Sequence, residues 1–579
     1  MKELMISQRE CLDTNLPVFM QTNPVLARIY ATRGIHDLDG LGRNLGELLP
    51  DSGLAGIDAA VERLVVALQE QQKILIVGDF DCDGATSTAV AVLALRMMGV
   101  KEVAYLVPNR FEYGYGLSPE IVVEALKQTP DLLITVDNGI SSIDGVAAAN
   151  FANLDVLVTD HHLAGRELPA ACAIVNPNQP NCSFSAKSTC GVGVIFYVMI
   201  ALRRALQQQG WFEKQGLPTP NLGSLLDLVA LGTVADVVPL EQNNRVLVYQ
   251  GLQRIKAGRC RPGIKALIEL SGRQQHKIAS SDLGYALAPR LNAAGRLEDM
   301  SIGIECLLTE SEHKAKELAA TLNDLNQERK GIEQEMQQQA LDLLANLQLD
   351  DEELPYGLSL YEPEWHQGVI GILASRIKER THRPVIAFAQ GDEGELKGSA
   401  RSIPGFHVRD GLDAIASQHP TLLRKFGGHA MAAGLTLSEA DLPLFQSAFD
   451  VEVRRQLSES DLQQQVMTDG ELLASDMTIE LAEMLRDAGP WGHQFPEPLF
   501  EGRFSLLQQR VVGHRHLKMV LMEPLSGLAV DAIQFNADMD IWPDESQTHV
   551  RVVYRLDVNE FRGRKTVQML VDHLIPVNN

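Results

Sequence analysis

Short apolar runs that end in acidic or imidazole clusters constrain the fold of this chain more than any other feature. The three runs are KILIVGDFDCDG (73–84), DLLITVDNG (131–139) and LDVLVTDHH (154–162), and a further run, EVAYLVPNR at 102–110, has the same texture. Helix-like stretches at Ser87–Met98 and Ser118–Lys127 separate the runs, so the pattern predicts βαβ crossovers and a parallel sheet. Ligands bind beyond the carboxyl ends of such strands, where the three polar clusters are expected.

The chain is long enough for several domains, because 579 residues exceed what one hydrophobic core usually supports. Hydrophobic residues at 45% and charged residues at 22% exclude a disordered or collagen-like chain. No apolar run approaches the roughly 18 residues of a membrane helix, and the first residues lack the apolar core of a signal peptide. The seven cysteines form no CxxC pair. We therefore expect a cytoplasmic protein with reduced thiols and no membrane partner.

Beyond residue 300 the pattern of apolar and polar residues changes. Apolar residues at helical spacing between Ser311 and Leu347, interrupted by Arg329, predict one long helix. A second α/β unit is predicted over 356–455. Residues 1–70 look helical and carry no catalytic signature. Alternating segments near the end predict a small β-barrel: Arg510–Val512, Lys518–Leu521, Val550–Tyr554 and Thr566–Val571.

The net charge of −24 argues against a polyanionic partner, but its distribution is uneven. The segment Asp299–Glu353 carries 14 acidic and 4 basic residues. Between Arg245 and Lys277, by contrast, the sequence contains eight basic residues and a single acidic residue, Glu269. A basic strip on an acidic body can focus a polyanion into one groove. A solvated helix face explains the same residues equally well.

The first polar cluster, Asp79-Phe-Asp81-Cys-Asp83-Gly, directly follows an apolar run. Alternate residues of an extended segment share a face, so three carboxylates can converge on a cation. An EF-hand loop also begins DxDxDG, but here the twelfth position is Val90 and the preceding segment is strand-like. The sequence contains no GxxxxGK[ST] phosphate loop. A solvated acidic turn remains the alternative.

Asp137 and the Asp160-His161-His162 triplet make that alternative weaker, because three parallel strands then carry polar groups at one edge. Asp236 is a lone charge in the apolar run 231–239, and a buried charge needs a partner. Carboxylates with imidazoles suit Mg²⁺ or Mn²⁺ better than zinc. The ligands outnumber the needs of one ion, so we expect two ions bridged by a carboxylate such as Asp137. The predicted reaction is hydrolysis of a phosphate ester.

In this order, DFDCDG, TVDNG, TDHH and GTVADVVPL resemble the four motifs of the DHH phosphoesterase superfamily. Later segments extend the resemblance, over nearly the whole chain, to the bacterial single-strand-specific exonucleases of that superfamily: Pro289–Leu297, Trp365–Gly371, Gly398–Ser402 and Gly427–Gly434. The resemblance implies an α/β fold with a parallel-sheet DHH core, a long connecting helix, a smaller α/β DHH-associated domain and a C-terminal OB-like β-barrel. The expected segments are an N-terminal helical segment (1–70), the DHH domain (71–305), the connecting helix (306–352), the DHH-associated domain (353–456) and the OB-fold domain (460–579).

The resemblance further implies a 5′→3′ exonuclease that degrades single-stranded DNA to mononucleotides in recombination and repair. His162 is similar to the family residue that faces the scissile phosphate, and Asp160 is expected to orient its neighbours. Single-strand-binding protein and a helicase are candidate partners of an expected monomer. The implied ligands of two Mg²⁺ or Mn²⁺ ions are Asp79, Asp81, Asp83, Asp137, His161 and Asp236.

Two regions carry candidate contacts with the DNA strand. The small residues of Gly427–Gly434 let a backbone approach a phosphate, although a helix-packing segment would have the same composition. On the barrel, basic residues fit a single-strand groove with aromatic stacking by Phe504, Phe535, Tyr554 or Phe561, although core packing also explains these rings. The expected DNA contacts are Arg110, Arg290, Arg296, Arg401, Gly428, His429, Arg515, Lys518 and Arg562; for Arg110 an ordinary surface position is equally plausible.

Other functions fit parts of the sequence. A nanoRNase or cyclic-dinucleotide phosphodiesterase of the same superfamily would not need the barrel and the basic strip. A non-catalytic scaffold that binds single-stranded DNA would not need the intact acidic motifs. The Gly-Gly-His segment at 427–429 also resembles part of alanyl-tRNA synthetase, but no aminoacylation motif accompanies it.

Overall fold

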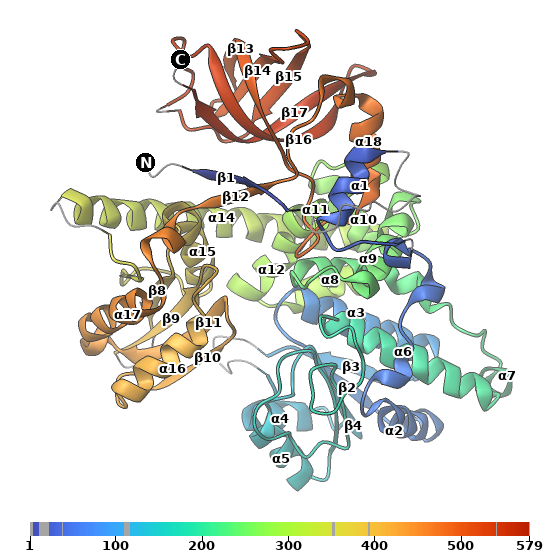
Figure 1. The fold of residues 1–579 in the computed structure, drawn as a ribbon. Coiled ribbons are helices and arrows are strands. Elements are labelled where there is room, and N and C mark those ends of the chain that lie inside the picture. Colours follow the sequence, from blue (N-terminus) through green and yellow to red (C-terminus); the bar gives the residue numbers. More distant parts are fainter. Residues whose placement is uncertain are drawn as a thin grey trace. The chain divides into compact units, whose positions relative to one another are not determined.

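The computed structural model describes residues 4–10, 23–37, 39–108, 116–349, 354–391, 394–539 and 541–577 (Figure 1). They form two compact units. The smaller unit contains the residues up to Ser7 and 323–466, and the larger unit contains 8–322 and 467–579. Arg110, a predicted DNA contact, lies outside the described residues. Among the described residues, no helix combines the length and apolarity that a membrane span requires.

The larger unit contains the predicted parallel sheet, with strand order β3-β2-β4-β5-β6 and every pair parallel. Strands β2 and β4 are buried along their whole length, which explains their continuous apolar sequence. The three strands that precede the polar clusters, β2, β4 and β5, are direct neighbours. The strands are β2 (Ile74–Val77), β3 (Val103–Leu106), β4 (Leu132–Val136), β5 (Asp155–Thr159) and β6 (Ala173–Val175).

Helices cover this sheet and extend it into a helical layer. Helices α4 and α5 pack against β2, β4 and β5 in one apolar cluster. Helix α3, buried on nearly all sides, is enclosed by contacts with α6, α8 and α13. The helices are α2 (Ile57–Gln69), α3 (Cys82–Met97), α4 (Pro119–Leu126), α5 (Ile143–Phe151), α6 (Gly191–Gln208), α7 (Trp211–Gln215), α8 (Leu226–Ala235), α9 (Gln242–Lys256), α10 (Pro262–Leu270), α11 (Ser280–Asp282), α12 (Ala288–Leu297) and α13 (Ser301–Leu308).

The N-terminal segment is less helical than expected. Within its described residues (4–10, 23–37 and 39–70), the regular elements apart from α2 are the strand β1 (Met5–Gln8) and helix α1 (Pro24–Ala31), and residues 39–53 form three one-turn 3-10 helices. Six glycines and a proline between residues 34 and 56 explain the broken pattern. The segment packs against residues far along the chain, since Arg33 donates to both carboxylate oxygens of the buried Asp469 at 2.8 and 3.0 Å.

The C-terminal barrel is confirmed, with the closed order β13-β14-β15-β17-β16. Helix α18 (Ile479–Ala488) contacts β16 and β17. The strand β15, with the weakly apolar sequence AVDAIQ, was missed by the sequence analysis, and the other strands are longer than predicted. The strands are β13 (Phe500–Val512), β14 (His516–Met522), β15 (Ala529–Gln534), β16 (His549–Phe561) and β17 (Arg564–Pro576).

The smaller unit is a mixed sheet between two helical layers, with order β10-β11-β9-β8-β7 and only the pair β7–β8 parallel. One apolar cluster joins the sheet to α16 and α17, and another joins it to α15 and to the long helix α14 (Glu312–Leu349). Strand β1 pairs with β12 (Gln465–Thr468). The elements are β7 (Leu358–Tyr361), α15 (Ile370–Thr381), β8 (Val385–Gln390), β9 (Glu395–Arg401), α16 (Val408–Gln418), β10 (Lys425–Gly428), β11 (Ala432–Ser438) and α17 (Leu442–Gln456).

The predicted long helix is α14 (Glu312–Leu349), whose residues fall partly in each unit. Arg329, which interrupts its apolar row, is buried and donates to Glu333 at 2.6 Å. Glu333 in turn accepts from Arg376 of α15 at 2.9 Å. The interruption is therefore a satisfied buried charge network rather than a break in the helix.

Candidate metal centre

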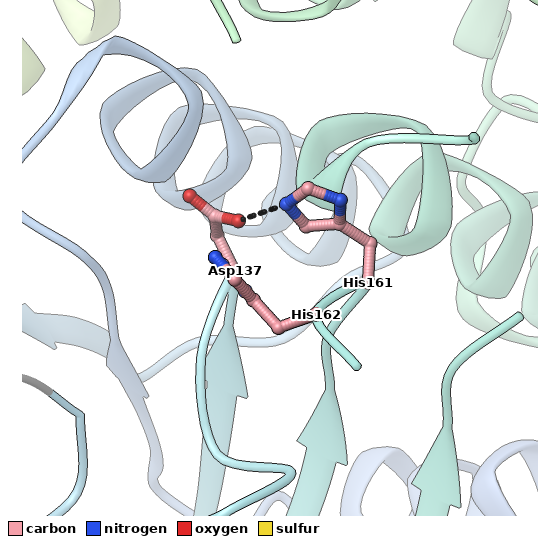
Figure 2. A group of neighbouring side chains, drawn as sticks. All are labelled: Asp137, His161 and His162. Atoms are coloured by element: carbon pink, nitrogen blue, oxygen red, sulfur yellow. Dashed lines mark ion pairs between the residues drawn. The ribbon is translucent and has the colours of Figure 1, made fainter. Parts of the chain in front are cut away.

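The predicted metal ligands converge at the carboxyl edge of the parallel sheet. Ligand atoms of Asp79, Asp81 and Asp137 lie within 4.8 Å of one another, and so do those of Asp83, His161 and Asp236. A carboxylate oxygen of Asp137, Oδ1, lies 3.1 Å from Nε2 of His161, and the same nitrogen lies 3.5 Å from Oδ2 of Asp236. Figure 2 shows the Asp137 carboxylate facing the His161 ring. The six side chains therefore form two groups of potential metal ligands that meet at Asp137 and His161, and a third group, Asp137, His161 and His162, also has ligand atoms within 4.8 Å of one another.

The electrostatics of this cluster favour bound cations. Burial, together with the charges of Asp83, Asp81 and other acids, raises the pKa of Asp137 well above its usual range. Burial and the charge of Asp81 raise the pKa of Asp83 to about 7. The pKa of Asp236 is raised well above its usual range for similar reasons. Divalent ions relieve this repulsion, and a set of carboxylates with one imidazole fits Mg²⁺ or Mn²⁺.

Backbone conformation aims two of these side chains into the site. Asp137 has a φ of 62°, in the left-handed region. Asp236 ends helix α8, and the next residue, Val237, has a φ of 59°. A left-handed β-branched residue is a strained conformation that persists only where the surrounding structure holds it. Both departures from ordinary backbone geometry fall at or beside ligand positions, which is typical of functional sites.

Two glycines permit the close packing around Asp83. The amide groups of Gly191 and Val192, at the start of α6, donate to its carboxylate at 2.7 and 2.9 Å. A Cβ atom on Gly191 would lie 2.6 Å from Asp137, and one on Gly232 would lie 2.9 Å from Oδ1 of Asp83. The positive end of the α6 dipole also stabilises the charge on Asp83. The sequence analysis missed Gly191, whose only signal is its place at the start of an apolar helix.

The buried Asp160 and the half-buried His162 form a second unit beside the candidate ligands. Oδ1 of Asp160 accepts hydrogen bonds from the backbone of His161 and His162, and lies 2.8 Å from Nδ1 of His162. Burial lowers the pKa of His162, but the hydrogen bond and charge of Asp160, with Asp236 and Asp79, outweigh burial and raise it to about 9. The contact with Asp160 orients the His162 ring and leaves Nε2 as its second hydrogen-bonding nitrogen.

Three asparagines that the sequence analysis missed hold the ligand loops. Nδ2 of Asn178 donates to the His161 carbonyl at 2.6 Å, and Nδ2 of Asn176 donates to the His162 carbonyl at 2.9 Å. Oδ1 of Asn292, on α12, accepts from the amide of Cys82 at 2.7 Å. The available signal was the Asn-Pro-Asn that follows strand β6, because asparagine satisfies backbone groups in irregular loops.

Arg290 and Arg296, two predicted DNA contacts, lie on helix α12 next to the first acidic motif. A Cβ atom on Gly295 of this helix would lie 1.8 Å from the Phe80 carbonyl oxygen. Arg290 is only 9% exposed and donates to the Ala286 carbonyl, whereas Arg296 is half-buried in the last turn. The helix therefore supports the motif, and Arg296 is the more accessible of the two.

The contacts predicted in the smaller unit lie close together within it. Arg401, at the end of β9, donates to the hydroxyl of Ser399 at 3.2 Å, and its guanidinium lies 3.0 Å from where a Cβ of Gly371 would be. Gly371 belongs to the first turn of α15. Arg401 pairs with Ala432 of β11, whose carbonyl accepts from His429 in the Gly428-His429 turn. Arginine, a helix N-terminus and a glycine turn together make a suitable anion site.

On the barrel, the predicted contacts differ in exposure. Arg515 is exposed in the turn between β13 and β14, and Arg562 lies at the tip of the β16–β17 hairpin. Lys518 is half-buried and lies 3.7 Å from Asp531. Of the candidate stacking rings, Phe504 and Tyr554 are buried in the barrel core, whereas Phe535 and Phe561 are exposed. Core packing was therefore the right interpretation for two of the four rings.

Four of the eight basic residues between Arg245 and Lys277 pair with acids from elsewhere in the larger unit. Lys256 pairs with Asp487, Lys265 with Glu312, Lys277 with Glu560 and Arg273 with Asp282. Arg261 donates to the carbonyls of Leu307 and Leu308 at the end of α13. These contacts favour a structural role for the strip over the polyanion groove that its composition indicated.

Three family models match this sequence. The "DHH family, N-terminal domain" matches residues 73–233, the "DHHA1 domain" residues 355–455 and the "RecJ OB domain" residues 468–573. The single-stranded-DNA-specific exonuclease RecJ of Escherichia coli (strain K12) is 54% identical over 578 residues, which cover 100% of both chains. These matches cover every region described above.

Solved structures match over the whole chain as well. The crystal structure of RecJ in complex with Mn²⁺ from Thermus thermophilus has a TM-score of 0.79 at 29% identity, covering 100% of this chain and 80% of that chain. The corresponding Mg²⁺ complex has a TM-score of 0.73 at 28% identity, with coverage of 100% and 79%. Both ions are the kind that the carboxylate-rich cluster was predicted to bind.

Proposed function

Because this chain belongs to the RecJ family of the DHH superfamily, we propose that it is an exonuclease that hydrolyses single-stranded DNA from the 5′ end, releasing mononucleotides with two divalent metal ions. The chain is a nuclease, and Mg²⁺ or Mn²⁺ is its cofactor. The observation that carries the two-ion proposal is the pair of ligand groups that meet at Asp137 and His161.

The two groups divide the ligands between two positions. Asp79, Asp81 and Asp137 would hold one ion, and Asp83, His161 and Asp236 would hold the other, with Asp137 close enough to serve both. When bound, the ions would supply an activated water and stabilise the charge on the leaving oxygen. The α6 amides keep Asp83 oriented, and the loop asparagines keep the backbone of His161 and His162 in place.

We assign His162 to the scissile phosphate. Asp160 fixes its Nδ1 and raises the pKa of the ring, so Nε2 can donate a hydrogen bond to a phosphate oxygen and a proton to the leaving oxygen. Asp160 itself is 1% exposed and serves as the positioning residue of this pair. We therefore propose that six side chains bind the metal ions, that His162 donates the proton and that Asp160 orients His162.

The 5′ polarity is supported by the anion site of the smaller unit. A terminal phosphate carries more charge than an internal phosphodiester, and Arg401 with the α15 N-terminus and the Gly428-His429 turn suits such a group. Within the larger unit, further contacts with the strand are proposed for Arg290, Arg296, Arg515, Lys518 and Arg562.

We propose three further features for this chain. They are action in recombination and repair, a monomeric state, and docking of single-strand-binding protein and a helicase. The five-segment division is likewise proposed. In its support, the family matches at 73–233, 355–455 and 468–573 fall inside the proposed segments 71–305, 353–456 and 460–579.

A time course on a single-stranded oligonucleotide labelled at its 5′ end tests this function. With Mn²⁺ or Mg²⁺ we expect immediate release of labelled mononucleotide, and a chelator should abolish it. A ladder of shortened strands that keep the label would show attack from the 3′ end and would contradict the polarity. Binding without cleavage would favour a scaffold instead.

A further inference from the structure

One short segment of the larger unit is hydrogen-bonded to the surroundings of three candidate metal ligands. Residues 187–192, called the frame segment below, comprise the end of the loop after β6 and the first two residues of α6. The three ligands, Asp83, His161 and Asp236, form one of the groups whose ligand atoms lie within 4.8 Å of one another. They come from three distant parts of the chain, so their relative positions depend on contacts between those parts.

The α6 end of the frame segment holds Asp83. The amides of Gly191 and Val192 donate to the two carboxylate oxygens of Asp83 at 2.7 and 2.9 Å, and Asp83 is only 1% exposed. Hydrogen bonds to an ionised carboxylate are stronger than those between neutral groups. The orientation of Asp83 therefore follows the position of the frame segment.

Asn178 connects the other end of the frame segment to His161. Its Nδ2 donates to the His161 carbonyl at 2.6 Å and to the Lys187 carbonyl at 3.1 Å. The amide group of asparagine has two hydrogens, so one side chain bridges the two backbone segments. The backbone amide of Asn178 donates to Oδ1 of Asn176 at 2.7 Å, which fixes the loop that carries this bridge.

Asn244, in the first turn of α9, makes an equivalent bridge to the backbone after Asp236. Its Nδ2 donates to the carbonyls of Ser188 and Pro239, both at 2.9 Å. Pro239 follows Asp236 by three residues, and the strained Val237 lies between them. Asn244 is 1% exposed, and its Oδ1 accepts no hydrogen bond from the residues that the structure describes. A buried acceptor without a partner is costly, so the two donated hydrogen bonds are what this side chain contributes.

We propose that the frame segment, together with Asn178 and Asn244, sets the geometry of the metal ion bound by Asp83, His161 and Asp236. Neither asparagine is a ligand, and each is a positioning residue that acts through the backbone beside a ligand. The inference rests on the proposed two-ion centre and adds the residues that determine how tightly one of its ions is bound. Removing a group that orients a metal ligand typically costs about 10–100-fold in metal affinity.

Calorimetric titration of the metal-free protein with Mn²⁺ compares Asn178→Ala and Asn244→Ala with the matched control Asn243→Ala. Asn243 precedes Asn244 on α9 and is also buried, but its Oδ1 accepts from the Tyr197 hydroxyl at 2.9 Å and from the Leu49 amide at 3.1 Å. The two test variants should each bind one ion about 10–100-fold more weakly. The control should bind Mn²⁺ as the wild type does, although its Tm falls because buried hydrogen bonds are lost.

Hydrolysis of single-stranded DNA at varied Mn²⁺ concentration gives a second readout. The half-saturating Mn²⁺ concentration should rise about 10–100-fold in Asn178→Ala and Asn244→Ala, with an unchanged KM for DNA, and should stay unchanged in Asn243→Ala. A purely structural role would lower the Tm and leave the Mn²⁺ dependence unchanged, so wild-type Mn²⁺ affinity in both test variants would overturn the proposal. Asn178 is half-buried, so its variant keeps the test decisive if Asn244→Ala does not fold.

The double variant Asn178→Ala/Asn244→Ala tests whether both asparagines act through one segment. Loss of either bridge should already displace the frame segment, so the double variant should lose less Mn²⁺ affinity than the product of the two single losses. Losses that multiply would show two independent effects and would overturn the role of a common segment.

These measurements distinguish the positioning role from the proposed function. If the wild type binds Mn²⁺ but hydrolyses no single strand, the exonuclease proposal fails and the titration still decides the positioning role. If the wild type binds a single ion, the two-ion centre fails. Weaker binding of that ion in both test variants would then still support the positioning role, and unchanged binding would overturn it.

Discussion

The Asp137 carboxylate lies 3.1 Å from Nε2 of His161, and this contact joins two groups of candidate metal ligands that come from four separate segments of the chain. Asp137 reaches this position from a left-handed backbone conformation directly after β4. A shared carboxylate of this kind is the element that distinguishes a two-ion centre from two unrelated acidic clusters.

Replacing the shared carboxylate should abolish most of the activity. Asp137→Asn keeps the shape of the side chain and removes its charge, so we expect hydrolysis of single-stranded DNA to fall by about 10³-fold or more, since several kcal/mol of charge stabilisation are lost. The matched control is Asp155→Asn, at the exposed start of β5, which should stay near the wild-type rate. Steady-state hydrolysis measures both, and an Asp137→Asn enzyme within tenfold of the wild type would contradict the assignment.

Position 191, at the start of α6, should accept only glycine. In Gly191→Ala the new methyl group would lie 2.6 Å from Asp137, so the carboxylate or the helix must move. We expect weaker Mn²⁺ binding and a lower Tm, measured by calorimetry and thermal unfolding. Gly331→Ala, in α14, is the control: its methyl group meets nothing within 4 Å, so the variant should gain up to about 1 kcal/mol of stability. Unchanged metal affinity in Gly191→Ala would argue against the close packing described here.

The effect of metal on stability should grow with pH. The pKa of Asp83 is about 7 in the folded protein and about 3.9 when unfolded, so the folded state holds its proton more firmly. Stability of the metal-free protein should therefore fall as pH rises from about 4 through about 7. Since ions displace these protons, Mn²⁺ should raise the Tm more at pH 8 than at pH 5.5. Thermal unfolding with Mn²⁺ and with chelator tests this; an equal or smaller rise at pH 8 would refute it.

The ion pair between Arg33 and Asp469 should support the fold without affecting the metal centre. Both side chains are at most 1% exposed, and Arg33→Ala removes two charge-assisted hydrogen bonds from the Asp469 carboxylate, which keeps its 3.1 Å ion pair with Arg9, so the variant should lose about 2–3 kcal/mol of unfolding free energy. Arg33→Lys should rescue little, because lysine cannot donate two parallel hydrogen bonds. The half-exposed pair of Arg63 and Asp155 is the control, and its loss should cost at most about 1 kcal/mol. Denaturant unfolding that shows similar losses for both pairs would contradict this ranking.

The sequence was sufficient to predict that the candidate metal ligands lie at one edge of the sheet, because the carboxyl ends of parallel strands meet at the same edge. Asp137 and His161 could be assigned from that rule and from the short apolar runs before them. The contacts of Asp83 with Gly191 and of Asn178 with His161 could not, since they depend on how α6 and the loop after β6 pack. Such contacts join residues that are far apart in the sequence, and no helical or strand periodicity relates their positions.

Charge and exposure were harder to predict than strands. The sequence left a polyanion groove and a solvated helix face equally open for the basic strip, because its acidic partners, such as Glu312, Asp487 and Glu560, are far away in the sequence. Alternation along barrel strands likewise identifies two faces without telling which face is the core. Only the closed barrel shows that Tyr554 points inward and that Phe561 lies at an exposed hairpin.

Titration of the metal-free protein with Mn²⁺, followed by electron paramagnetic resonance, tests the two-ion centre most directly. We expect two Mn²⁺ ions per chain with a spin-coupled signal, and loss of that coupling in Asp137→Asn. A single bound ion, or two ions without coupling in the wild type, would contradict a centre shared through Asp137.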